Sequence, residues 1–392
     1  MSADKKKRIL FLPAWYPTRN DNMGGIFVRA FGWAMLEKAK VHVLHVAGER
    51  NLKNLFEYVV TYDKGLETHI VYYRKPLQKN IFTVFFEGLM YGFATFLGYF
   101  KYRSKHERPD VFHVFVLTRT AVLPYVLSLF IKTKYYITEV WSRYLPEDNT
   151  FNGNFRKWLT RKIVRRSSGI STVSVSLKNA LIKHNLNHSN FKVIHSVVPS
   201  SFFKTELIPH NKNGVIKFLH VSCFDDYIKN ISGMLNAFKI VEDEGFEFEL
   251  ELIGNGADFE EMVAHAKKLN LMRTTFSGKL TGDDLFKAFE RSDALVLFSN
   301  FETQGCVILE AQASGMPVIG SNTGGIPELI SKDGGLLVAP GNELDLADAI
   351  KSIIINYCNY DRRQIRDKAI ANYSFENIAA KFLKFYNTEV EK

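Results

Sequence analysis

The feature that most constrains this chain is the alternation of short apolar runs with longer segments of helical pattern. Residues 8–15, 41–47 and 110–117 are runs of this kind, each with the length of a buried strand. Further expected strands cover residues 69–74, 135–140, 169–176, 192–198, 216–222, 248–254, 274–280, 294–299, 317–321 and 335–340. Strands separated by helical segments predict parallel sheets with helices on both faces, so the expected fold class is α/β.

Length and charge divide the chain into two expected domains. A chain of 392 residues with 46% hydrophobic content favours two domains over one. Residues 1–205 hold 32 Lys and Arg against 13 Asp and Glu, a balance of +19, and the remainder carries −9. The sign changes at residues 199–214, which are rich in Pro, Asn and Lys and form the expected linker. We expect doubly wound, Rossmann-like domains at 1–205 and 206–372, and a terminal helix in 373–392 that packs back towards the first domain.

Cysteine usage and the first residues favour a reducing, cytoplasmic setting. Cys223, Cys306 and Cys358 are far apart with no CxxC pair, which suggests neither a disulfide framework nor a zinc site. The basic start leads into an apolar run that Pro13 interrupts and that lacks a small-residue cleavage site. We therefore interpret it as a first strand rather than a signal peptide.

Residues 80–108 leave three interpretations open. Between Ile81 and Phe100 only Glu87 is charged, a length that could span a bilayer. The glycines within the run, Glu87 itself and the cationic tail at 101–108 suit a core helix or a helix lying in the membrane surface equally well.

Residues 299–330 follow an expected strand and contain two glutamates, Glu302 and Glu310, with Gly305 between them. In such sheets ligands bind at the carboxyl ends of the strands, and in two-domain proteins the cleft between domains is the default site. Gly305 predicts a helix start, so the amides of Gly305, Cys306 and Val307 would lie at the positive end of a helix, which suits a diphosphate.

The two carboxylates complete this pattern. Glu302 in the preceding loop suits sugar hydroxyls, and Glu310 on the helix suits a vicinal diol such as a ribose. A nucleotide sugar has all three parts. Two acidic residues eight apart occur often by chance, but the continuation with Gly324 and Gly325 in a close-approach loop strengthens the interpretation.

The stretch resembles the signature of family 4 retaining glycosyltransferases with the GT-B fold. The similarity extends to residues 12–35, 109–115, 137–144, 221–238, 252–262, 334–340 and 373–386. The group resembled most closely builds bacterial surface polysaccharides on a lipid carrier. The resemblance implies a retaining transfer from a nucleotide-diphosphate sugar to a saccharide acceptor, which is expected to be linked to undecaprenyl diphosphate.

The resemblance also implies roles for residues that match the family pattern. Glu302 would contact the donor sugar, Glu310 the ribose and Lys229 the diphosphate. Gly24 and Gly25 match the N-terminal glycine loop that approaches the diphosphate. Gly254, Gly305, Cys306 and Val307 complete the expected donor site.

Two positions depart from the family pattern. Cys223 stands where the family commonly has a phosphate-binding arginine, for which Arg19 or Arg119 could substitute. Val140 stands where many relatives have a histidine facing the acceptor.

Glu139, the neighbour of Val140, is expected to be catalytic together with Glu302 and Lys229. The acceptor side is expected to use His113, Arg119, Trp141 and Arg143, although a histidine at a strand end is more often a core residue.

No DxD triad is present, and we expect neither a catalytic metal nor a cofactor. The resemblance implies that the leaving diphosphate helps to take the acceptor proton and that Glu302 orients the sugar, unlike the nucleophilic carboxylates of glycoside hydrolases.

Alternatives from other classes are a sugar-nucleotide epimerase or phosphorylase-like enzyme, and a degenerate donor-binding or partner-stabilising protein that Val140 and Cys223 keep open. The basic segment 156–166 carries no nucleic-acid motif, so an anionic membrane surface is the expected partner rather than RNA or DNA. The expected location is cytoplasmic, with a peripheral position on the inner face of the cell membrane as the alternative.

Overall fold

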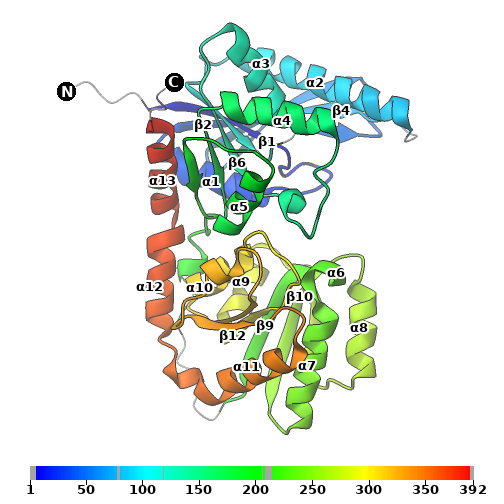
Figure 1. Ribbon diagram of the computed structural model, residues 1–392, viewed down its shortest axis with the longest axis vertical. Helices are drawn as coiled ribbons and strands as arrows, with labels where there is room; N and C mark the ends of the chain where they lie inside the picture. The colour runs from blue at the N-terminus through cyan, green and yellow to red at the C-terminus, as the bar shows by residue number, and fades with distance from the viewer. Residues whose placement is uncertain (1–5, 77–79, 118, 205, 208–213, 389–392) are drawn as a thin grey trace, which may run out of the picture. The chain divides into compact units, whose positions relative to one another are not determined.

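The computed structural model describes residues 6–76, 80–117, 119–204, 206–207 and 214–388. Its contacts divide the chain into two compact units (Figure 1). The first unit comprises Met1–Val173, Leu177–Val197 and Phe375–Lys392, and the second comprises Ser174–Ser176 and Val198–Ser374. Each unit contains one sheet covered by helices.

The first sheet has the strand order β3-β4-β2-β1-β5-β6-β7-β8. Its strands are β1 (Arg8–Pro13), β2 (Lys40–Glu49), β3 (Phe56–Asp63), β4 (Leu66–Arg74), β5 (Val111–Phe115), β6 (Tyr135–Glu139), β7 (Gly169–Thr172) and β8 (Phe191–Val193). All neighbours pair in parallel except β3 and β4, which are antiparallel. The expectation of a purely parallel sheet, which omitted β3, was therefore wrong at this edge.

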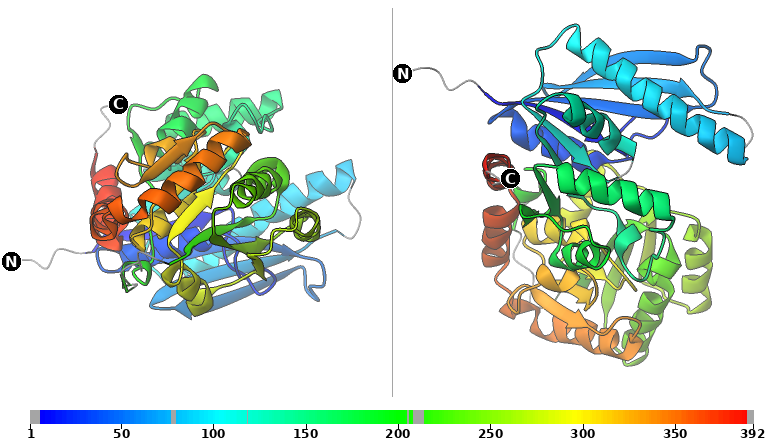
Figure 2. Two further views of the ribbon diagram at one scale, coloured as in Figure 1. Left: turned by 90° about the horizontal axis from the view of Figure 1, so that it is seen from below. Right: turned by 45° about the horizontal axis from the view of Figure 1, so that its top comes forward.

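The two faces of the first sheet bury different helices. The helices of this unit are α1 (Ile26–Leu36), α2 (Ile81–Arg103), α3 (Val122–Phe130), α4 (Asn154–Arg166), α5 (Val175–Lys183) and α13 (Phe375–Asn387). Leu10 and Leu12 of β1 share a core with α2 to α5, whereas Ile9 and Phe11 share one with α1 and α13. This alternation follows from the period of two along a strand. In the right-hand view of Figure 2, α2 runs across the strands of this sheet.

The second sheet is entirely parallel, with the order β11-β10-β9-β12-β13-β14. Its strands are β9 (Ile216–Cys223), β10 (Phe248–Asn255), β11 (Thr274–Gly278), β12 (Ala294–Leu297), β13 (Val318–Ser321) and β14 (Gly335–Val338). Its helices are α6 (Asp226–Lys229), α7 (Ile231–Asp243), α8 (Phe259–Lys268), α9 (Gly282–Glu290), α10 (Cys306–Ala313), α11 (Glu343–Asn356) and α12 (Arg362–Tyr373). One core contains α7, α8 and α11, and another contains α9, α10 and α12.

The boundary between the units falls at Val197, eight residues before the expected position of 205. The Val198 amide donates to the Tyr373 carbonyl at 3.0 Å, and Val198 and Phe202 are buried in the core that contains α10 and α12. Phe202, at the start of the expected linker, therefore belongs to the hydrophobic core of the second unit. Residues 205 and 208–213 of that linker lie outside the described residues.

Each sheet has a point where the direction of strand addition reverses. In the first sheet the chain runs outward from β1 to β2 and then outward again from β5. In the second sheet the reversal lies between β9 and β12. Ligands of open α/β sheets bind outside the carboxyl ends of the strands at such points.

Candidate active site

The carboxyl ends of β9 and β12 bring Lys229 and Glu302 together in the second unit. Lys229 is the last residue of α6, and Glu302 lies in the loop between β12 and α10. The Lys229 ammonium and the Glu302 carboxylate form an ion pair, with 13% and 14% of their side chains exposed. Glu302 Oε1 also accepts the Thr303 amide at 3.1 Å. The structure thus places two of the expected catalytic residues in contact.

Backbone contacts fix the two loops that carry this pair. The Asn300 amide donates to the Ile228 carbonyl at 2.8 Å, and the Asn300 side chain donates to the Tyr227 carbonyl at 2.9 Å. Asp225 caps α6 by accepting the Ile228 amide. These contacts hold the loops that carry Lys229 and Glu302 next to each other.

The charge state of Lys229 follows from two opposing effects. Burial alone would lower the pKa of Lys229, but the adjacent Glu302 carboxylate outweighs it, and the pKa is raised. Lys229 is therefore a cation at neutral pH, and it can offset negative charge on a bound anion.

The second part of the site is the start of α10. Gly305 has φ +84° and is the N-cap of this helix, as expected from the sequence. Cys306 and Val307 begin the helix, so their amides lie at its positive end.

Gly324 and Gly325 hold this loop from the other side. A Cβ at Gly324 would lie 1.7 Å from the Glu302 carbonyl oxygen, and φ there is +54°. The Gly325 amide donates to the same oxygen at 3.3 Å. Glycine is needed at both positions because the backbone of this loop packs directly against the backbone of Glu302 and Thr303.

Glu310 lies one turn further along α10 and is partly buried. Among the described residues, no hydrogen bond or ion pair reaches its carboxylate. Burial raises the pKa of Glu310 to about 7. A carboxylate that is desolvated and unpaired can gain hydrogen bonds from a ligand.

Gly254 and Cys223 lie at the carboxyl ends of β10 and β9. A Cβ at Gly254 would lie 1.9 Å from the Ser222 carbonyl oxygen, so this glycine permits close strand packing. Cys223 is exposed and is the last residue of β9, so it lies at the same edge of the sheet as the loop that carries Lys229.

Arg19 is not available as the substitute cation. Its guanidinium donates to Glu49 at 2.8 Å and to Glu57 at 2.9 Å, and it stacks on Tyr72. Two carboxylates already pair with this arginine, which favours Arg119 as the alternative cation.

In the first unit, Gly24 and Gly25 lie in the loop after β1. Gly25 has φ +65° and caps α1, and a Cβ there would lie 2.0 Å from the Trp15 carbonyl oxygen. Asp21 accepts the amides of Met23 and Gly24 at 3.0 Å each. The glycines therefore let this loop fold against the end of β1.

Glu139 does not have the catalytic geometry that was expected. It is fully buried, and its carboxylate accepts the amides of Leu117, Val140 and Trp141 at 2.7 to 2.9 Å. Burial raises the pKa of Glu139, although these hydrogen bonds oppose the shift. Three backbone donors occupy the carboxylate, so Glu139 holds the loops after β5 and β6 together instead of reacting.

The acceptor-side expectation for His113 was also wrong. His113 is fully buried, with Nδ1 at 2.5 Å from the Tyr386 hydroxyl and Nε2 at 2.7 Å from Thr138 Oγ1. Burial lowers its pKa to about 3, so the ring is neutral. His113 is a core residue that joins β5, β6 and α13.

Trp141 and Arg143 do lie together, and a third residue joins them that the sequence analysis missed. The Arg143 guanidinium lies 3.5 Å from the centre of the Trp141 ring, and Trp15 meets that ring edge-on at 4.9 Å. Trp15 is 38% exposed. Its position two residues after Pro13, the last residue of β1, is the sequence signal that could have identified it.

Arg119 follows β5 in a short 3₁₀ helix, Arg119–Ala121, and its guanidinium lies 4.5 Å from the centre of the Tyr91 ring. It is exposed near the strand reversal of the first sheet.

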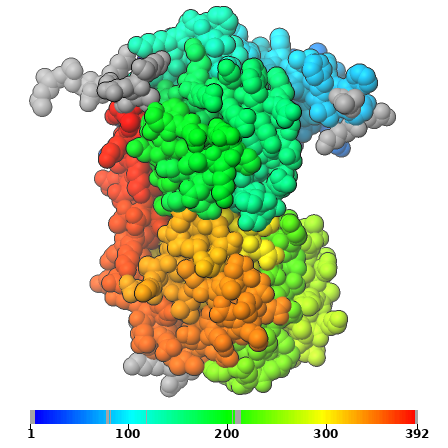
Figure 3. Space-filling view, in the orientation of Figure 1, coloured from blue at the N-terminus to red at the C-terminus, as the bar shows by residue number. Residues whose placement is uncertain are grey.

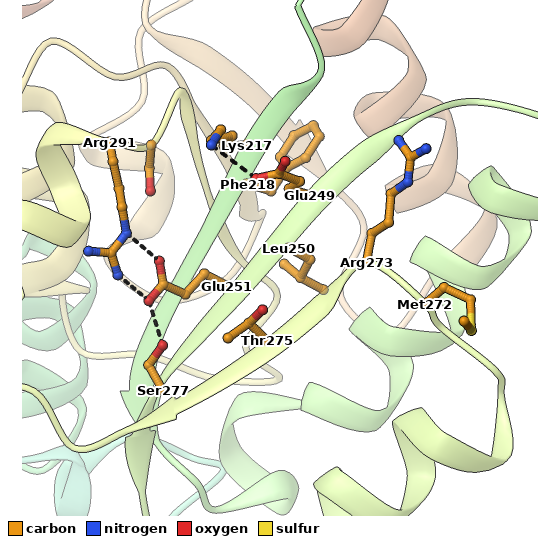
Figure 4. Close-up of a pocket in the computed structure, with 11 residues that line it drawn as sticks. Lys217, Phe218, Glu249, Leu250, Glu251, Met272, Arg273, Thr275, Ser277 and Arg291 are labelled. Carbon is orange, nitrogen blue, oxygen red and sulfur yellow. Dashed lines mark hydrogen bonds and ion pairs between the residues drawn. The ribbon is translucent and has the colours of Figure 1, made fainter.

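A cavity in the second unit lies elsewhere, over β9, β10 and β11 (Figure 4). Glu251 in it accepts Arg291 and Ser277, and Lys217 pairs with Glu249 at 3.1 Å. Arg273, which also lines the cavity, pairs with Glu247 outside the lining at 2.8 Å. The cavity contains none of the residues expected from the sequence.

Residues 203–372, which contain Lys229, Glu302 and Glu310, match the model of the family "Glycosyl transferases group 1". The matched residues make up most of the second unit. Among curated relatives, N-acetyl-alpha-D-glucosaminyl L-malate synthase of Bacillus anthracis is 28% identical over 62% of this chain and 65% of its own. Other curated relatives match over as little as 24% of their length. The chain thus spans less than two thirds of these relatives.

Solved structures match the chain over nearly its whole length. Sucrose-phosphate synthase from Thermosynechococcus elongatus aligns with a TM-score of 0.75 and 18% identity, covering 97% of this chain and 98% of its own. HepE from Anabaena, solved in complex with UDP and glucose, aligns with a TM-score of 0.71 and 15% identity, covering 98% and 100%. At these identities the similarity shows the fold alone. It is the expected GT-B fold, in which two Rossmann-like domains are combined.

Proposed function

We propose that this protein transfers a sugar from a nucleotide-diphosphate sugar to a saccharide acceptor, with retention of the anomeric configuration. The observation that carries the proposal is the Lys229–Glu302 pair at the strand reversal of a group 1 glycosyltransferase domain, beside the start of α10. A cation, a set of helix-terminal amides and two carboxylates match the parts of a nucleotide sugar.

Each of these groups has a distinct role in the proposed donor complex. Lys229 offsets the charge that develops on the diphosphate as the glycosidic bond breaks. The amides at the start of α10 bind the phosphate oxygens. Glu310 accepts hydrogen bonds from the ribose hydroxyls, which its unpaired carboxylate favours.

Glu302 orients the sugar in this proposal. Its carboxylate is already paired with Lys229, which makes it a poor nucleophile but a well-positioned acceptor for sugar hydroxyls. The acceptor hydroxyl attacks the face that the diphosphate leaves, and the leaving diphosphate takes the proton. The charge on the diphosphate is met by Lys229 and α10, so this transfer needs no metal ion.

The proposed acceptor site is in the first unit. Trp15 and Trp141 offer ring faces and edges to a sugar, and Arg143 adds a positive charge for an anionic group. Arg119 is a further exposed cation in this unit. A saccharide linked to a lipid diphosphate has both an apolar sugar face and an anionic group.

A lipid-linked acceptor would also account for the outer surface of the first unit. Among the described residues, no helix combines the length and the hydropathy needed to cross a bilayer. However, α2 exposes 82% of Phe82, 70% of Phe85 and 61% of Phe93, while its other face lies in the core. This fits the in-plane alternative and supports contact with a membrane surface.

Cations on α4 extend this surface. Helix α3 packs against both α2 and α4, and α4 lies on the face of the first unit that Figure 3 shows. Lys162 and Arg165 are exposed on α4. Arg161 and Arg166 instead donate to His184 and Ser128, so they hold neighbouring elements. A peripheral association with an anionic membrane follows as part of the proposal.

The function is tested with a panel of nucleotide sugars, by thermal shift and by release of the nucleoside diphosphate in the presence of saccharide acceptors. We expect at least one donor to raise the Tm and to be turned over. Lys229→Met should abolish both effects, whereas Lys217→Met, which removes an exposed lysine of β9, should change neither. Far-UV circular dichroism checks that both variants fold.

Binding without turnover would favour the degenerate donor-binding alternative. No donor effect on the wild-type protein, or equal effects of the two lysine substitutions, would contradict the proposal.

A further inference from the structure

Three histidines and one glutamate converge in the first unit, apart from the residues discussed above. His42 belongs to β2, Glu67 and His69 belong to β4, and His106 lies just after α2 (Figure 1). One potential ligand atom from each of the four lies within 4.8 Å of the other three.

The same ring nitrogen of each histidine faces the carboxylate. Nε2 lies 3.0 Å from a Glu67 carboxylate oxygen in His106, 3.2 Å in His69 and 3.8 Å in His42. His106 and His69 approach Oε1 and His42 approaches Oε2, so three imidazole nitrogens gather around one carboxylate. This is a donor set that Zn²⁺ and its neighbours in the first transition series bind.

Two tyrosines hold the opposite nitrogens of the buried rings. The Tyr58 hydroxyl lies 2.6 Å from His69 Nδ1, and the Tyr102 hydroxyl lies 3.2 Å from His42 Nδ1. Outer hydrogen bonds of this kind fix the orientation of metal-binding histidines and leave Nε2 directed at the ion.

One atom of the cluster lacks a hydrogen bond. His69 is fully buried, and its Nε2 makes no hydrogen bond although it lies 3.2 Å from Glu67. A buried polar atom without a partner is unfavourable, and an ion at the centre of the cluster would satisfy it.

We propose that His42, Glu67, His69 and His106 bind one divalent transition-metal ion, with Zn²⁺ as the expected ion. Four protein ligands close a tetrahedral site, which is typical of structural rather than catalytic zinc. The hard ions Mg²⁺ and Ca²⁺ prefer oxygen ligands and do not fit three imidazoles.

The ion would clamp one end of the first unit. His42 and Glu67 lie near the amino ends of β2 and β4, so the site lies at the opposite edge of the sheet from the loops that follow the strands. A cavity lined by His42, Glu67 and His106 opens beside the cluster and gives an ion a route of entry. The ion would therefore join β2, β4 and the end of α2 without touching the reacting sugar.

This site was not predicted from the sequence. Its ligands come from three separate segments, and only Glu67 and His69 are close in the chain, so no metal motif is visible.

The first test titrates Co²⁺ into full-length protein that has been treated with a chelator and dialysed. We expect the strong visible absorption of tetrahedral Co²⁺, saturating at one ion per chain, and its loss on addition of Zn²⁺. Zn²⁺ at about a hundred times its Kd should raise the Tm by about 5 to 10 °C. No saturable binding, or only the weak spectrum of an octahedral ion, would overturn the proposal.

The second test uses His106→Gln and Glu67→Gln, because both side chains are only partly buried. Each should weaken Zn²⁺ binding by more than about 100-fold, since even outer partners of metal ligands contribute about 10- to 100-fold. His265→Gln replaces a partly buried histidine in α8 of the second unit and should leave the affinity unchanged. Equal affinities in all three variants would rule out this site, and the Co²⁺ spectrum of the wild-type protein decides the matter if a variant fails to fold.

Discussion

At the scale of single residues, the Lys229–Glu302 pair carries the proposed function. Two charges whose side chains are only 13% and 14% exposed lose much of their hydration, and their mutual attraction seldom compensates fully. A pair of apolar residues would often be at least as stable at such a position. The presence of the Lys229–Glu302 ion pair at the strand reversal is therefore better explained by binding of a charged ligand than by a gain in stability.

The first prediction concerns Glu302→Gln, which keeps the size of the side chain. We expect kcat to fall by about 10² to 10³, because one oriented contact to the reacting sugar is lost. The thermal shift with donor should remain, since Lys229 and α10 still bind the diphosphate. Steady-state kinetics beside Glu249→Gln, an exposed glutamate of β10, provide the comparison. A kcat close to that of the wild-type protein would refute the role of Glu302.

The second prediction concerns Glu310→Gln and the dependence of stability on pH. Burial raises the pKa of Glu310 from 4.5 to about 7 in the folded protein. The folded state therefore binds this proton more tightly than the unfolded chain, and stability falls as pH rises from about 4.5 to about 7. Glutamine mimics the protonated form and removes this loss.

At pH 8 the variant should therefore have a free energy of unfolding about 2 to 3 kcal/mol higher than the wild type, and at pH 4.5 the two should be nearly equal. Urea denaturation at both pH values measures the difference. Donor affinity should fall in the same variant, because the ribose loses a carboxylate. A variant that is less stable than the wild type at pH 8 would contradict this account of Glu310.

Individual residues were predictable where the signal was local. Gly305 and the order of Glu302 and Glu310 fix a loop and a helix start within one short segment. Burial was not predictable in the same way, because His113 is enclosed by Tyr386, which lies 273 positions later. Glu139 has the same difficulty, since the Leu117 amide that it binds comes from another loop.

At the scale of elements, the strands of both sheets followed from their apolar runs, with β3 as the exception. The sequence of β3 mixes apolar and polar residues without a continuous apolar run, because this edge strand has no buried residue. Its connection to β4 did carry a signal. Lys64 and Gly65 both have positive φ, the geometry of a two-residue hairpin turn, and Asp-Lys-Gly is compatible with it.

The third prediction concerns the exposed face of α2. Phe82→Ser with Phe85→Ser should weaken binding to anionic vesicles by about tenfold or more, because each aromatic ring that enters the interface removes apolar area from water. Met272→Ser, at a residue of the second unit that is 84% exposed, is the matched control. Vesicle flotation measures binding. If both variants bind as tightly as the wild-type protein, α2 is not part of the membrane-binding surface.

The cations of α4 provide an independent check of the same surface. Lys162→Gln with Arg165→Gln should weaken binding at low salt, on the order of 1 kcal/mol per charge, and the effect should fade at high salt. Donor binding should not change. Binding that does not respond to salt would contradict an electrostatic contribution.

At the scale of the whole molecule, the chain returns to its first unit at the end. Helix α13 buries Phe382 and Tyr386 in the core that also contains α1. The fourth prediction is that Phe382→Ala lowers the free energy of unfolding by about 3 to 5 kcal/mol, as expected for a large core truncation. Lys384→Ala, on the exposed side of α13, should have little effect. Urea denaturation of the full chain compares the two, and similar losses would contradict the core position of Phe382.

The central claim, retaining transfer from a nucleotide sugar, is tested most directly by a proton NMR time course of the anomeric signals. The donor identified by thermal shift is mixed with a saccharide acceptor and the protein. We predict that an α-configured donor signal decreases while an α-linked product appears at the same rate, and that Glu302→Gln slows both by about 10² to 10³. A β-linked product would contradict retention, and a donor signal unchanged in the presence of acceptor would contradict transfer.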